Sequence, residues 1–470
     1  MVVGEVASTV DLLVVGGGPG GYAAALHGAR LGRSVTLVER EAVGGTCLNV
    51  GCIPSKALIE VADAHTVGQR VRSWGLEATS TVDMAGVRAH LSDVVAGLTD
   101  GVRGLLAQAG VVTVEGHARF TRPGRVSVER GDAVELLDYR DAVVATGSRP
   151  IGLTEVPIDG DRIVESADLL FSDSLPERLV LVGGGYVGVE LGCAFAKLGS
   201  EVTIVEAADR ILPGFDARTS RQVAAGLRDL GIGLCVGHRA VGLDDHGLRI
   251  QPADPEAGSD GSDLVTLPAD RICVVVGRRP NSDTVAIERA GADVGADGLV
   301  VVDPTRRAAD HLYAVGDLTA GPALAHKATA EAEVAVDAAC GRPAAFDPTA
   351  IPLVVFSDPQ VLSVGLDRDA AAAAGMEPTV ARFPLGASGR ARTQGRTEGT
   401  VTMVADAYGT VVGVQAVGAH VAELAGEAAL AVETAATVED LAGTIHAHPT
   451  LGEALMEAAL GLAGRPVHGR

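Results

Sequence analysis

Two stretches of the chain repeat the same order of apolar runs, glycine-rich turns and helical patterns. In the first, an apolar run at 12–15 predicts a buried strand, an Ala-rich segment predicts a helix that ends near Leu31, and residues 34–38 predict a second strand. In the second stretch, strands are predicted at 179–182 and 201–205, around a helix that ends near Leu198. The pattern therefore predicts two βαβ units.

Further strands that end in a glycine turn suggest where domains begin and end. Val-rich runs at 143–150 and 274–281 resemble exits from a domain, and residues 313–317 predict another strand closed by Gly-Asp. Residues 253–263, rich in Asp, Gly and Ser, predict a surface hairpin loop. From residue 351 onward the chain alternates strand and amphipathic-helix patterns, which predicts a separate C-terminal domain.

Composition narrows the class of protein. With 470 residues, 61 of them Gly and only 3% aromatic, the chain fits a layered α/β protein of about three domains. The formal net charge of −22 and the absence of any Lys/Arg-rich block argue against a nucleic acid or an anionic membrane as partner. Residues 1–10 show no basic segment typical of a signal peptide, so a cytoplasmic location is expected.

Each predicted βαβ unit contains a glycine fingerprint followed by an acid at the end of its second strand. The first set is Gly16, Gly18, Gly21 and Glu39, and the second is Gly183, Gly185, Gly188 and Glu206. Such glycines let a pyrophosphate approach a helix N-terminus, and the acid hydrogen-bonds a ribose hydroxyl. Two bound dinucleotides are therefore predicted, with plain α/β crossovers as the alternative.

The acid of the second unit also bears on cofactor choice. Glu206 is followed by two alanines, and a carboxylate there repels the 2′-phosphate of NADP, so NAD is predicted. Arg210 is near enough in sequence to reach a phosphate, although a salt bridge at the rim of the site is the preferred interpretation. Asp317 closes a strand at the carboxyl edge of the first sheet, where it would face a polar ligand.

Cys47 and Cys52 stand in the run 44–56, directly after the first fingerprint. A bridge across four intervening residues adds little stability, so we interpret the pair as a redox disulfide beside a flavin. Two alternatives are a zinc site and inert core cysteines. The other four cysteines, at 193, 235, 273 and 340, are scattered singly, which argues against zinc, and the flanking glycines and Pro54 favour an exposed turn over a core segment.

These motifs identify a family. The sequence resembles the flavin disulfide reductases, and within them the branch that oxidises dihydrolipoamide, over nearly the whole chain. The resemblance rests on the segments 44–56, 183–190, 276–281, 313–317 and 446–453.

The family resemblance implies a fold class: two Rossmann-like dinucleotide-binding domains, for FAD and NAD, and a C-terminal α+β dimerisation domain. The FAD domain would comprise residues 1–150 and 282–350, the NAD domain residues 151–281, and the dimerisation domain residues 351–470. The resemblance also implies contacts with FAD from Gly16, Gly18, Gly21, Glu39, Thr46, Lys56, Ala118, Thr146, Gly147, Ser148, Asp317, Ala323, Leu324, Ala325 and His326, and with NAD from Gly183, Gly185, Gly188, Glu206 and Gly277.

The same resemblance assigns roles to the reacting residues. Cys47 would form the mixed disulfide with substrate, and Cys52 would be the inner thiolate beside the flavin. Lys56, one helical turn beyond Cys52, would place a positive charge there and pair with Glu190. An exposed lysine and a helix-surface glutamate are the alternative interpretations of these two residues.

A dithiol substrate needs a base, since the thiolate is the attacking species, and histidine titrates in the right range. His448 is the candidate, supplied to the disulfide of the partner subunit, and Glu453 would orient its ring. His446 either takes part in catalysis or orients the loop, and Tyr186 either covers the flavin or simply packs. Two departures from the family pattern are Gly452, where a small polar residue is usual, and Gln360, where Glu is usual.

The implied reaction is oxidation of protein-bound dihydrolipoamide, with electrons passing through the cysteine pair and FAD to NAD. The implied partners are a second copy of the chain and a lipoyl-carrying protein, and no metal is expected. The alternatives are a reductase of a small disulfide, a quinone-reducing or diaphorase-type flavoprotein, and a non-enzymatic subunit of a larger assembly. The intact cysteine pair argues against the quinone-reducing flavoprotein, and the retention of every candidate catalytic residue argues against a purely non-enzymatic role.

Overall fold

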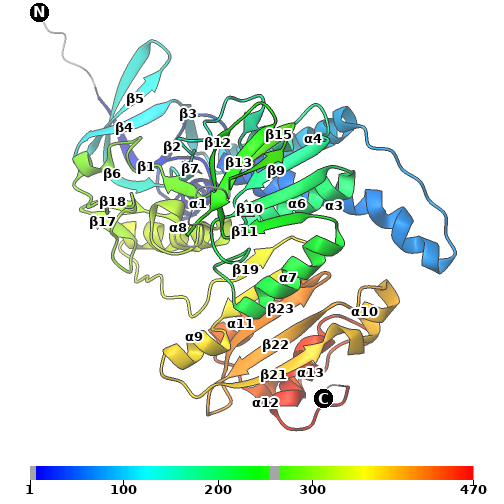
Figure 1. The fold of residues 1–470 in the computed structure, drawn as a ribbon. Helices are drawn as coiled ribbons and strands as arrows, with labels where there is room; N and C mark the ends of the chain where they lie inside the picture. The colour runs from blue at the N-terminus through cyan, green and yellow to red at the C-terminus, as the bar shows by residue number, and fades with distance from the viewer. Residues whose placement is uncertain (1–6, 255–263, 469–470) are drawn as a thin grey trace, which may run out of the picture.

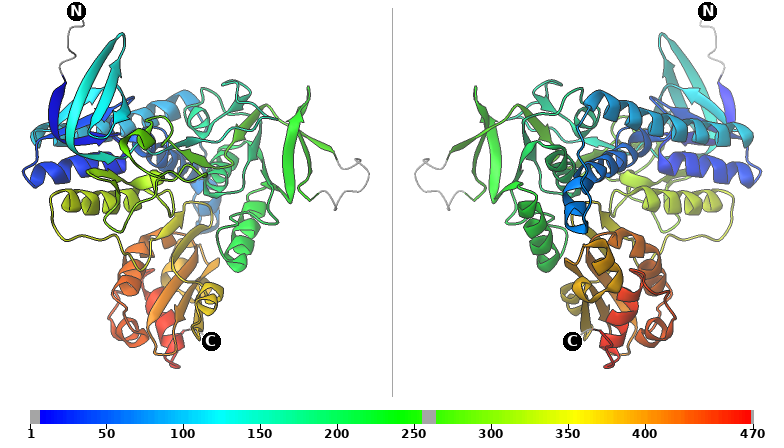
Figure 2. Two further views of the ribbon diagram at one scale, coloured as in Figure 1. Left: turned by 90° about the vertical axis from the view of Figure 1, so that its left-hand side faces the viewer. Right: turned by 90° about the vertical axis from the view of Figure 1, so that its right-hand side faces the viewer.

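The computed structural model describes residues 7–254 and 264–468. Three β-sheets with their helices form three lobes. Figure 1 shows two lobes side by side and the third, built from the C-terminal part of the chain, below them. The two views in Figure 2 show the same arrangement from either side, with the small antiparallel sheet of residues 238–268 projecting away from the lobes.

The first lobe is built on a sheet whose central strands are parallel. Its main strands run in the order β17-β18-β6-β1-β2-β3, and β4 and β5 extend it beside β6. Its strands are β1 (Ser8–Val15), β2 (Val35–Glu39), β3 (Val112–Glu115), β4 (His117–Arg122), β5 (Arg125–Arg130), β6 (Ala133–Val144), β17 (Arg307–Ala309) and β18 (Leu312–Ala314), and its helices are α1 (Pro19–Arg30), α2 (Gly45–Asn49), α3 (Cys52–Val71), α4 (Met84–Gln108) and α8 (Ala325–Ala339). The first predicted βαβ unit, β1-α1-β2, is confirmed.

The second lobe repeats this plan with a five-stranded parallel sheet in the order β11-β10-β9-β15-β8. Its strands are β8 (Ile163–Val164), β9 (Arg178–Val182), β10 (Glu201–Glu206), β11 (Gly233–Val236) and β15 (Arg271–Val274), and its helices are α5 (Ser166–Leu170), α6 (Tyr186–Leu198) and α7 (Ala217–Asp229). The second predicted βαβ unit, β9-α6-β10, is therefore also confirmed.

The chain passes between these two lobes twice. The outgoing segment β7 (Ser148–Pro150) and the returning segment β16 (Arg278–Pro280) pair antiparallel. Both follow strands that the sequence predicts to end in glycine turns. Strands β12 (His238–Leu243), β13 (Gly247–Pro252) and β14 (Val265–Pro268) form the small antiparallel sheet, and most of the predicted 253–263 loop lies outside the described residues.

The third lobe has the alternating strands and helices that the sequence predicts. Its antiparallel sheet runs β19-β20-β23-β22-β21. These strands are β19 (Leu353–Val355), β20 (Gln360–Gly365), β21 (Thr379–Pro384), β22 (Gly399–Ala405) and β23 (Val411–Gly418), and the helices are α9 (Arg368–Ala373), α10 (Gly389–Gln394), α11 (Ala425–Glu433), α12 (Val438–Gly443) and α13 (Glu453–Leu462). Helix α13 packs on β21 and β22, and α11 packs on β20 and β23.

One hydrophobic core joins all three lobes. It includes Leu58 of α3 and Phe195 of α6, both fully buried, together with Val361 and Val417 of the third sheet. Each Å² of apolar surface removed from water stabilises the folded state by about 25 cal/mol. Separating the lobes would expose this shared core, so its burial holds them in one arrangement. Helices α3 and α6, which begin at a cysteine and at a glycine turn respectively, are thereby brought together.

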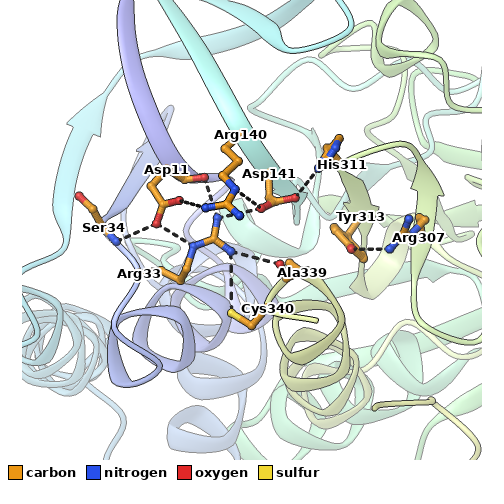
Figure 3. A network of polar contacts seen from close by, with 10 residues as sticks. All are labelled: Asp11, Arg33, Ser34, Arg140, Asp141, Arg307, His311, Tyr313, Ala339 and Cys340. Atoms are coloured by element: carbon orange, nitrogen blue, oxygen red, sulfur yellow. Dashed lines mark hydrogen bonds and ion pairs between the residues drawn. The ribbon is translucent and has the colours of Figure 1, made fainter. Parts of the chain in front are cut away.

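A polar network around Arg33 lies at the end of the first sheet that is opposite the glycine turn. Figure 3 shows the Arg33 guanidinium between Asp11 and Asp141, at 2.7 and 2.8 Å, while Cys340 accepts a weaker bond from it at 3.8 Å. Asp141 also contacts His311 Nδ1 at 2.9 Å. The network ties the segment before β2 to β1, β6, α8 and the turn before β18.

Replacing Arg33 with Met is expected to destabilise this lobe. Arg33 and Asp141 expose only 12% and 6% of their side chains, and removal of one member of a buried ion pair leaves the other without its partner. We expect a loss of about 2 kcal/mol, seen as a fall in melting temperature of about 5 °C. The exposed Arg289→Met is the control, and equal melting temperatures for the two variants would contradict the prediction.

Candidate active site

A cavity of about 610 Å³ opens between the first and second lobes. The first glycine turn, the cysteine run, the turn at 145–149 and the start of α8 line it from the first lobe, and α5 and α6 line it from the second. Predicted site residues on its wall are Gly16, Gly18, Glu39, Thr46, Cys47, Cys52, Lys56, Thr146, Gly147, Ser148, Glu190, Asp317, Ala323, Leu324 and Ala325.

The first glycine turn is shaped by contacts that exclude side chains. Gly16 has a φ of +99°, and a Cβ on Gly21 would lie 1.7 Å from the Gly16 carbonyl oxygen, so both positions require glycine. At Gly18, by contrast, a Cβ would come no closer than 3.9 Å to any atom. The space beside Gly18 at the N-terminus of α1 is open to the cavity, as binding of a pyrophosphate at this turn requires.

The second glycine turn repeats this geometry. Gly183 has a φ of +120°, a Cβ on Gly188 would lie 2.0 Å from the Gly183 carbonyl oxygen, and a Cβ on Gly185 would meet nothing within 4 Å. Gly183, Gly185, Gly188, Glu206 and Gly277 do not line the 610 Å³ cavity and lie instead at the carboxyl edge of the second sheet. The described residues therefore offer two separate places that fit a pyrophosphate.

The acids that follow the two turns are held alike. Glu39 accepts hydrogen bonds from the amides of Gly17 and Glu41 at 2.5 and 2.7 Å. Glu206 accepts them from the amides of Gly184 and Ala208 at 2.7 and 2.8 Å. Each carboxylate is thus fixed beside its glycine turn, with oxygen lone pairs remaining for a ribose hydroxyl.

Cys47 and Cys52 are free thiols that contact each other on the cavity wall. The hydrogen bond from Cys47, assisted by the charge of Lys56, lowers the pKa of Cys52 to about 7. The same hydrogen bond, together with burial, raises the pKa of Cys47 well above its usual range. The thiolate therefore forms more readily on Cys52 than on Cys47.

Lys56 contacts all three lobes. Its Nζ lies 2.7 Å from Glu190 Oε2 of α6 and 4.9 Å from the centre of the Phe356 ring. The other oxygen of Glu190 accepts the Phe356 amide at 2.8 Å, and the Glu190 side chain is only 5% exposed. The predicted Lys56–Glu190 pair is therefore present in the structure.

Asp317 faces the cavity within a chain of hydrogen bonds. Its Oδ2 accepts the Ser148 hydroxyl at 2.5 Å, and that hydroxyl accepts Arg278 Nε at 2.7 Å. Thr146 presents a buried hydroxyl with no partner among the described residues. Asn281 donates to the Thr146 carbonyl at 2.9 Å. The cavity wall thus offers both donors and acceptors to a polar ligand.

Three of the residues on the cavity wall had no assigned role in the sequence analysis. Arg278 and Asn281 belong to the recognised 276–281 segment, so a signal was present although no role was assigned to them. Glu165, whose pKa is raised by burial and by the charge of Asp168, precedes α5 and has no sequence motif.

Three residues predicted to contact FAD do not line the cavity: Gly21, which lies against the Gly16 carbonyl, Ala118 and His326. Ala118 is 2% exposed and packs in the apolar cluster around β4. His326 Nε2 contacts the Pro352 carbonyl at 2.9 Å, and neither residue lines the cavity. Their predicted contacts would have to come from backbone atoms or from a different side-chain conformation.

The histidine motif lies in the third lobe. His448 Nδ1 is 2.8 Å from Glu453 Oε1, and the other oxygen of Glu453 accepts the Thr450 amide at 2.9 Å. Burial alone would raise the pKa of Glu453, but the hydrogen bonds from His448 and Thr450 lower it below its usual range. The His448 side chain is 76% exposed, so its Nε2 side faces outward.

His446 is held more closely than His448. Its Nε2 lies 2.7 Å from Glu427 and its Nδ1 lies 3.0 Å from the Thr444 carbonyl, so both ring nitrogens have partners within the subunit. A Cβ on Gly452 would lie 3.4 Å from the His446 ring. These contacts favour the loop-orienting interpretation of His446.

The remaining residues that the sequence singled out are also placed. Tyr186 begins α6 on the cavity wall and is 42% exposed. Arg210 pairs with Asp209 at 3.3 Å, as in the rim salt-bridge interpretation. Gln360 accepts the Ala422 amide at 3.3 Å.

The described part of the chain contains neither a candidate metal site nor a helix that could span a membrane. Across residues 7–254 and 264–468 no group of three or more His, Cys, Asp and Glu side chains could hold a metal ion. No helix in these ranges is both long and apolar enough to cross a membrane.

The pKa of Cys52 can be tested in the reduced protein. Cys47→Ala removes the hydrogen bond that contributes most, and Lys56→Met removes a cation that favours the thiolate, so both raise the pKa of Cys52 from about 7, the first by the larger amount. The pH dependence of alkylation by iodoacetamide measures this value, with Cys52→Ser giving the background from the other cysteines. An unchanged midpoint in Cys47→Ala would contradict the assignment.

Comparison with known proteins agrees with this geometry. Residues 10–332 match the pyridine nucleotide-disulphide oxidoreductase family, and residues 351–459 match the dimerisation domain of the same family. The chain is 46% identical to Dihydrolipoyl dehydrogenase 2 of Haloarcula marismortui, covering 100% of both chains. It is 41% identical to the dihydrolipoyl dehydrogenase of Geobacillus stearothermophilus, covering 100% of this chain and 99% of that one.

Solved structures show the same fold. The crystal structure of LpdA from Mycobacterium tuberculosis superposes with a TM-score of 0.88 at 27% identity, covering 96% of this chain and 100% of the other. The HOCl-induced flavoprotein disulfide reductase RclA from Escherichia coli has a TM-score of 0.83 at 25% identity, covering 96% and 99%. The predicted fold class and family are therefore confirmed, and the chain belongs to the pyridine nucleotide-disulphide oxidoreductase family.

Proposed function

We propose that this protein is a dihydrolipoyl dehydrogenase, which oxidises dihydrolipoamide to lipoamide and reduces NAD. The observation that carries the proposal is the position of Cys47 and Cys52 on the wall of the cavity that also contains the first glycine turn. Identities of 40–46% over the whole chain to proteins named dihydrolipoyl dehydrogenase support this substrate.

FAD fits the first cavity. The open space at Gly18, the fixed carboxylate of Glu39 and the unpartnered Thr146 hydroxyl suit a pyrophosphate, a ribose and a polar chain respectively. Bound FAD supplies a two-electron relay between the cysteine pair and the nicotinamide. Residues of the first lobe that line the cavity, among them Thr46, Ser148, Asp317 and Leu324, would hold it.

The chemistry of the cysteines follows from their different pKa values. A substrate thiolate attacks the oxidised pair at Cys47, the bond between the sulfurs breaks, and Cys52 leaves as the thiolate that its pKa of about 7 favours. The second substrate thiol then attacks the mixed disulfide, its proton passes to Cys47, which leaves as a thiol, and lipoamide is released. The proton of the first substrate thiol goes to solvent. Lys56 stabilises the Cys52 thiolate, and Glu190 keeps Lys56 in place.

His448 is the proposed base for the substrate thiols. Glu453 fixes the ring through Nδ1, which leaves Nε2 to take a proton from one substrate thiol and return it to the departing sulfur. His448 does not line the 610 Å³ cavity of its own subunit. We propose that the 351–470 region forms a homodimer in which each His448 serves the cysteine pair of the other subunit.

The second glycine turn is the proposed site for NAD. Glu206, held by two backbone amides, faces the position of the adenosine ribose and would repel a 2′-phosphate. Arg210 is paired with Asp209 at the rim of this site. The hydride acceptor is therefore NAD rather than NADP.

The proposed protein partner is a lipoyl-carrying protein, and the proposed location is the cytoplasm. A transient catalytic disulfide suits a reducing compartment, where a permanent structural disulfide is unusual.

A second candidate is a reductase that uses a nicotinamide to reduce a small disulfide. The likeness to RclA, a flavoprotein disulfide reductase, favours it at 25% identity. The first candidate is preferred because the dihydrolipoyl dehydrogenases are more similar over the full chain.

The direct test is the initial rate of NAD reduction by dihydrolipoamide. We expect a fast rate with NAD and a rate at least about tenfold lower with NADP, because an acid facing a phosphate costs well over 1 kcal/mol. Cys52→Ser is expected to abolish thiol turnover while NADH oxidation by an artificial acceptor continues. A negligible rate with dihydrolipoamide beside rapid NADPH-dependent reduction of a small disulfide would favour the second candidate.

The proposed sharing of His448 between subunits has its own test. His448→Gln is expected to lower turnover about 10²- to 10⁴-fold through loss of the base. A hybrid dimer of one His448→Gln subunit and one Cys47→Ser subunit keeps one complete site, with cysteines from the first and histidine from the second. Differently tagged, co-expressed hybrids should recover about half of the wild-type activity. Hybrids no more active than the parent variants would show that His448 does not act across the interface.

A further inference from the structure

A fully buried charged cluster lies behind the cavity wall of the first lobe. Lys327 and Glu331 stand one turn apart on α8, with Nζ 3.2 Å from Oε2, and their residues are 2% and 0% exposed. Arg306 contacts the other oxygen of Glu331 at 2.9 Å. Leu324, Ala325 and Ala328 of the same segment line the cavity, whereas Lys327 and Glu331 do not.

The cluster holds both polar backbone groups of a single residue, Gly316. Glu331 Oε2 accepts the Gly316 amide at 2.7 Å, and Lys327 Nζ donates to the Gly316 carbonyl at 2.9 Å. The Thr319 hydroxyl joins Lys327 to Glu331, with bonds of 2.9 Å to each. Residues 316–319 form the 3₁₀ turn η4 (Gly316–Leu318) and its end, and Gly316 has a φ of +75°.

Asp317 projects from this same turn into the cavity. Its carboxylate is tied to Ser148 on the cavity side, so the turn is held by Ser148 in front and by the Lys327–Glu331 cluster behind. Burial lowers the pKa of Lys327, and the charges of Glu331 and Asp317 oppose that change.

The attraction between Lys327 and Glu331 adds little stability by itself, because the desolvation of a buried ion pair offsets much of it. The charged pair adds directional hydrogen bonds. Lys327 as donor and Glu331 as acceptor, at fixed positions, select one orientation of the Gly316 backbone. We infer that Lys327 and Glu331 are positioning residues that hold Asp317 in the orientation in which it binds FAD. The inference rests on the FAD site of the proposed function and is independent of the thiol substrate.

The test is a double-mutant cycle on FAD affinity. Lys327→Met, Glu331→Gln and Asp317→Asn are prepared singly, and each of the first two is also combined with the third. Apoprotein is titrated with FAD and followed by flavin fluorescence. We expect each single variant to raise the FAD dissociation constant about tenfold, and Lys327→Met or Glu331→Gln to have little further effect once Asp317 is Asn.

The flavin midpoint potential is the second readout. If the cluster acts by orienting Asp317, Lys327→Met and Glu331→Gln shift the potential in the same direction as Asp317→Asn. A direct effect of the removed charges would instead shift the two variants in opposite directions, because one loses a positive charge and the other a negative one. Arg33→Met, in the partly buried network at the other end of the sheet, is the control, expected to lower the melting temperature and leave the potential unchanged.

Both measurements have results that would reject the inference. The inference is overturned if the losses of FAD affinity in the cluster variants add fully to the loss in Asp317→Asn. It is also overturned if both cluster variants have the same flavin potential as Arg33→Met. If Lys327→Met does not fold, the isosteric Glu331→Gln carries the same cycle, and unaltered FAD affinity in that variant is sufficient to reject the proposal. Failure of dihydrolipoamide as substrate leaves both readouts interpretable, because neither involves a thiol.

Discussion

The contact of Glu190 with Lys56 and Phe356 is the point at which the three lobes depend on one another. The buried carboxylate pairs with an ammonium from α3, which begins at Cys52, and accepts a hydrogen bond from a backbone amide in the connection between β19 and β20 of the third sheet. An isolated buried carboxylate is expensive, so Glu190 is stable only while both neighbours are in place. The charge beside Cys52 is therefore coupled to the packing of the region that matches a dimerisation domain.

A second contact of the same kind lies farther along α6. Lys197, 6% exposed, contacts Asp63 of α3 and lies 2.6 Å from Asp358, which in turn contacts Arg396 of the third lobe. The core shared by α3, α6 and the third sheet surrounds both clusters. Apolar burial supplies the free energy that brings the lobes together, and the two polar clusters select a single relative orientation. A cavity formed between lobes keeps its shape only if that orientation is unique.

The sequence predicted those parts of the molecule that depend on neighbouring residues in the chain. Both βαβ units lie where periodicity and glycine spacing put them, because tight turns and strand burial are local requirements. The Lys56–Glu190 and His448–Glu453 pairs were predicted through family motifs, and the contacts are present. Ala118 and His326 were predicted as ligands, yet their side chains face other partners. Spacing does not specify which side of a strand or helix turns toward a cavity that forms only after the lobes meet. Glu165 and the Lys327–Glu331 cluster went unassigned for the same reason, since their partners are brought together by tertiary packing.

The cysteine pair and His448, the two ends of the proposed proton path, differ in their surroundings, and this difference argues for a site completed by a second subunit. Cys47 and Cys52 lie on the wall of a cavity, in surroundings that favour the thiolate on Cys52. His448 is three-quarters exposed at 76%, although its partner Glu453 is held by a backbone amide and its loop is anchored through His446. The His448 ring is fixed by Glu453 but faces outward, so its fixed orientation serves no group within its own subunit. The fixed orientation of His448 is useful only to a group on another molecule that binds here. Because the chain has a dimerisation domain, the surface that can bind in a fixed geometry is that of a second copy.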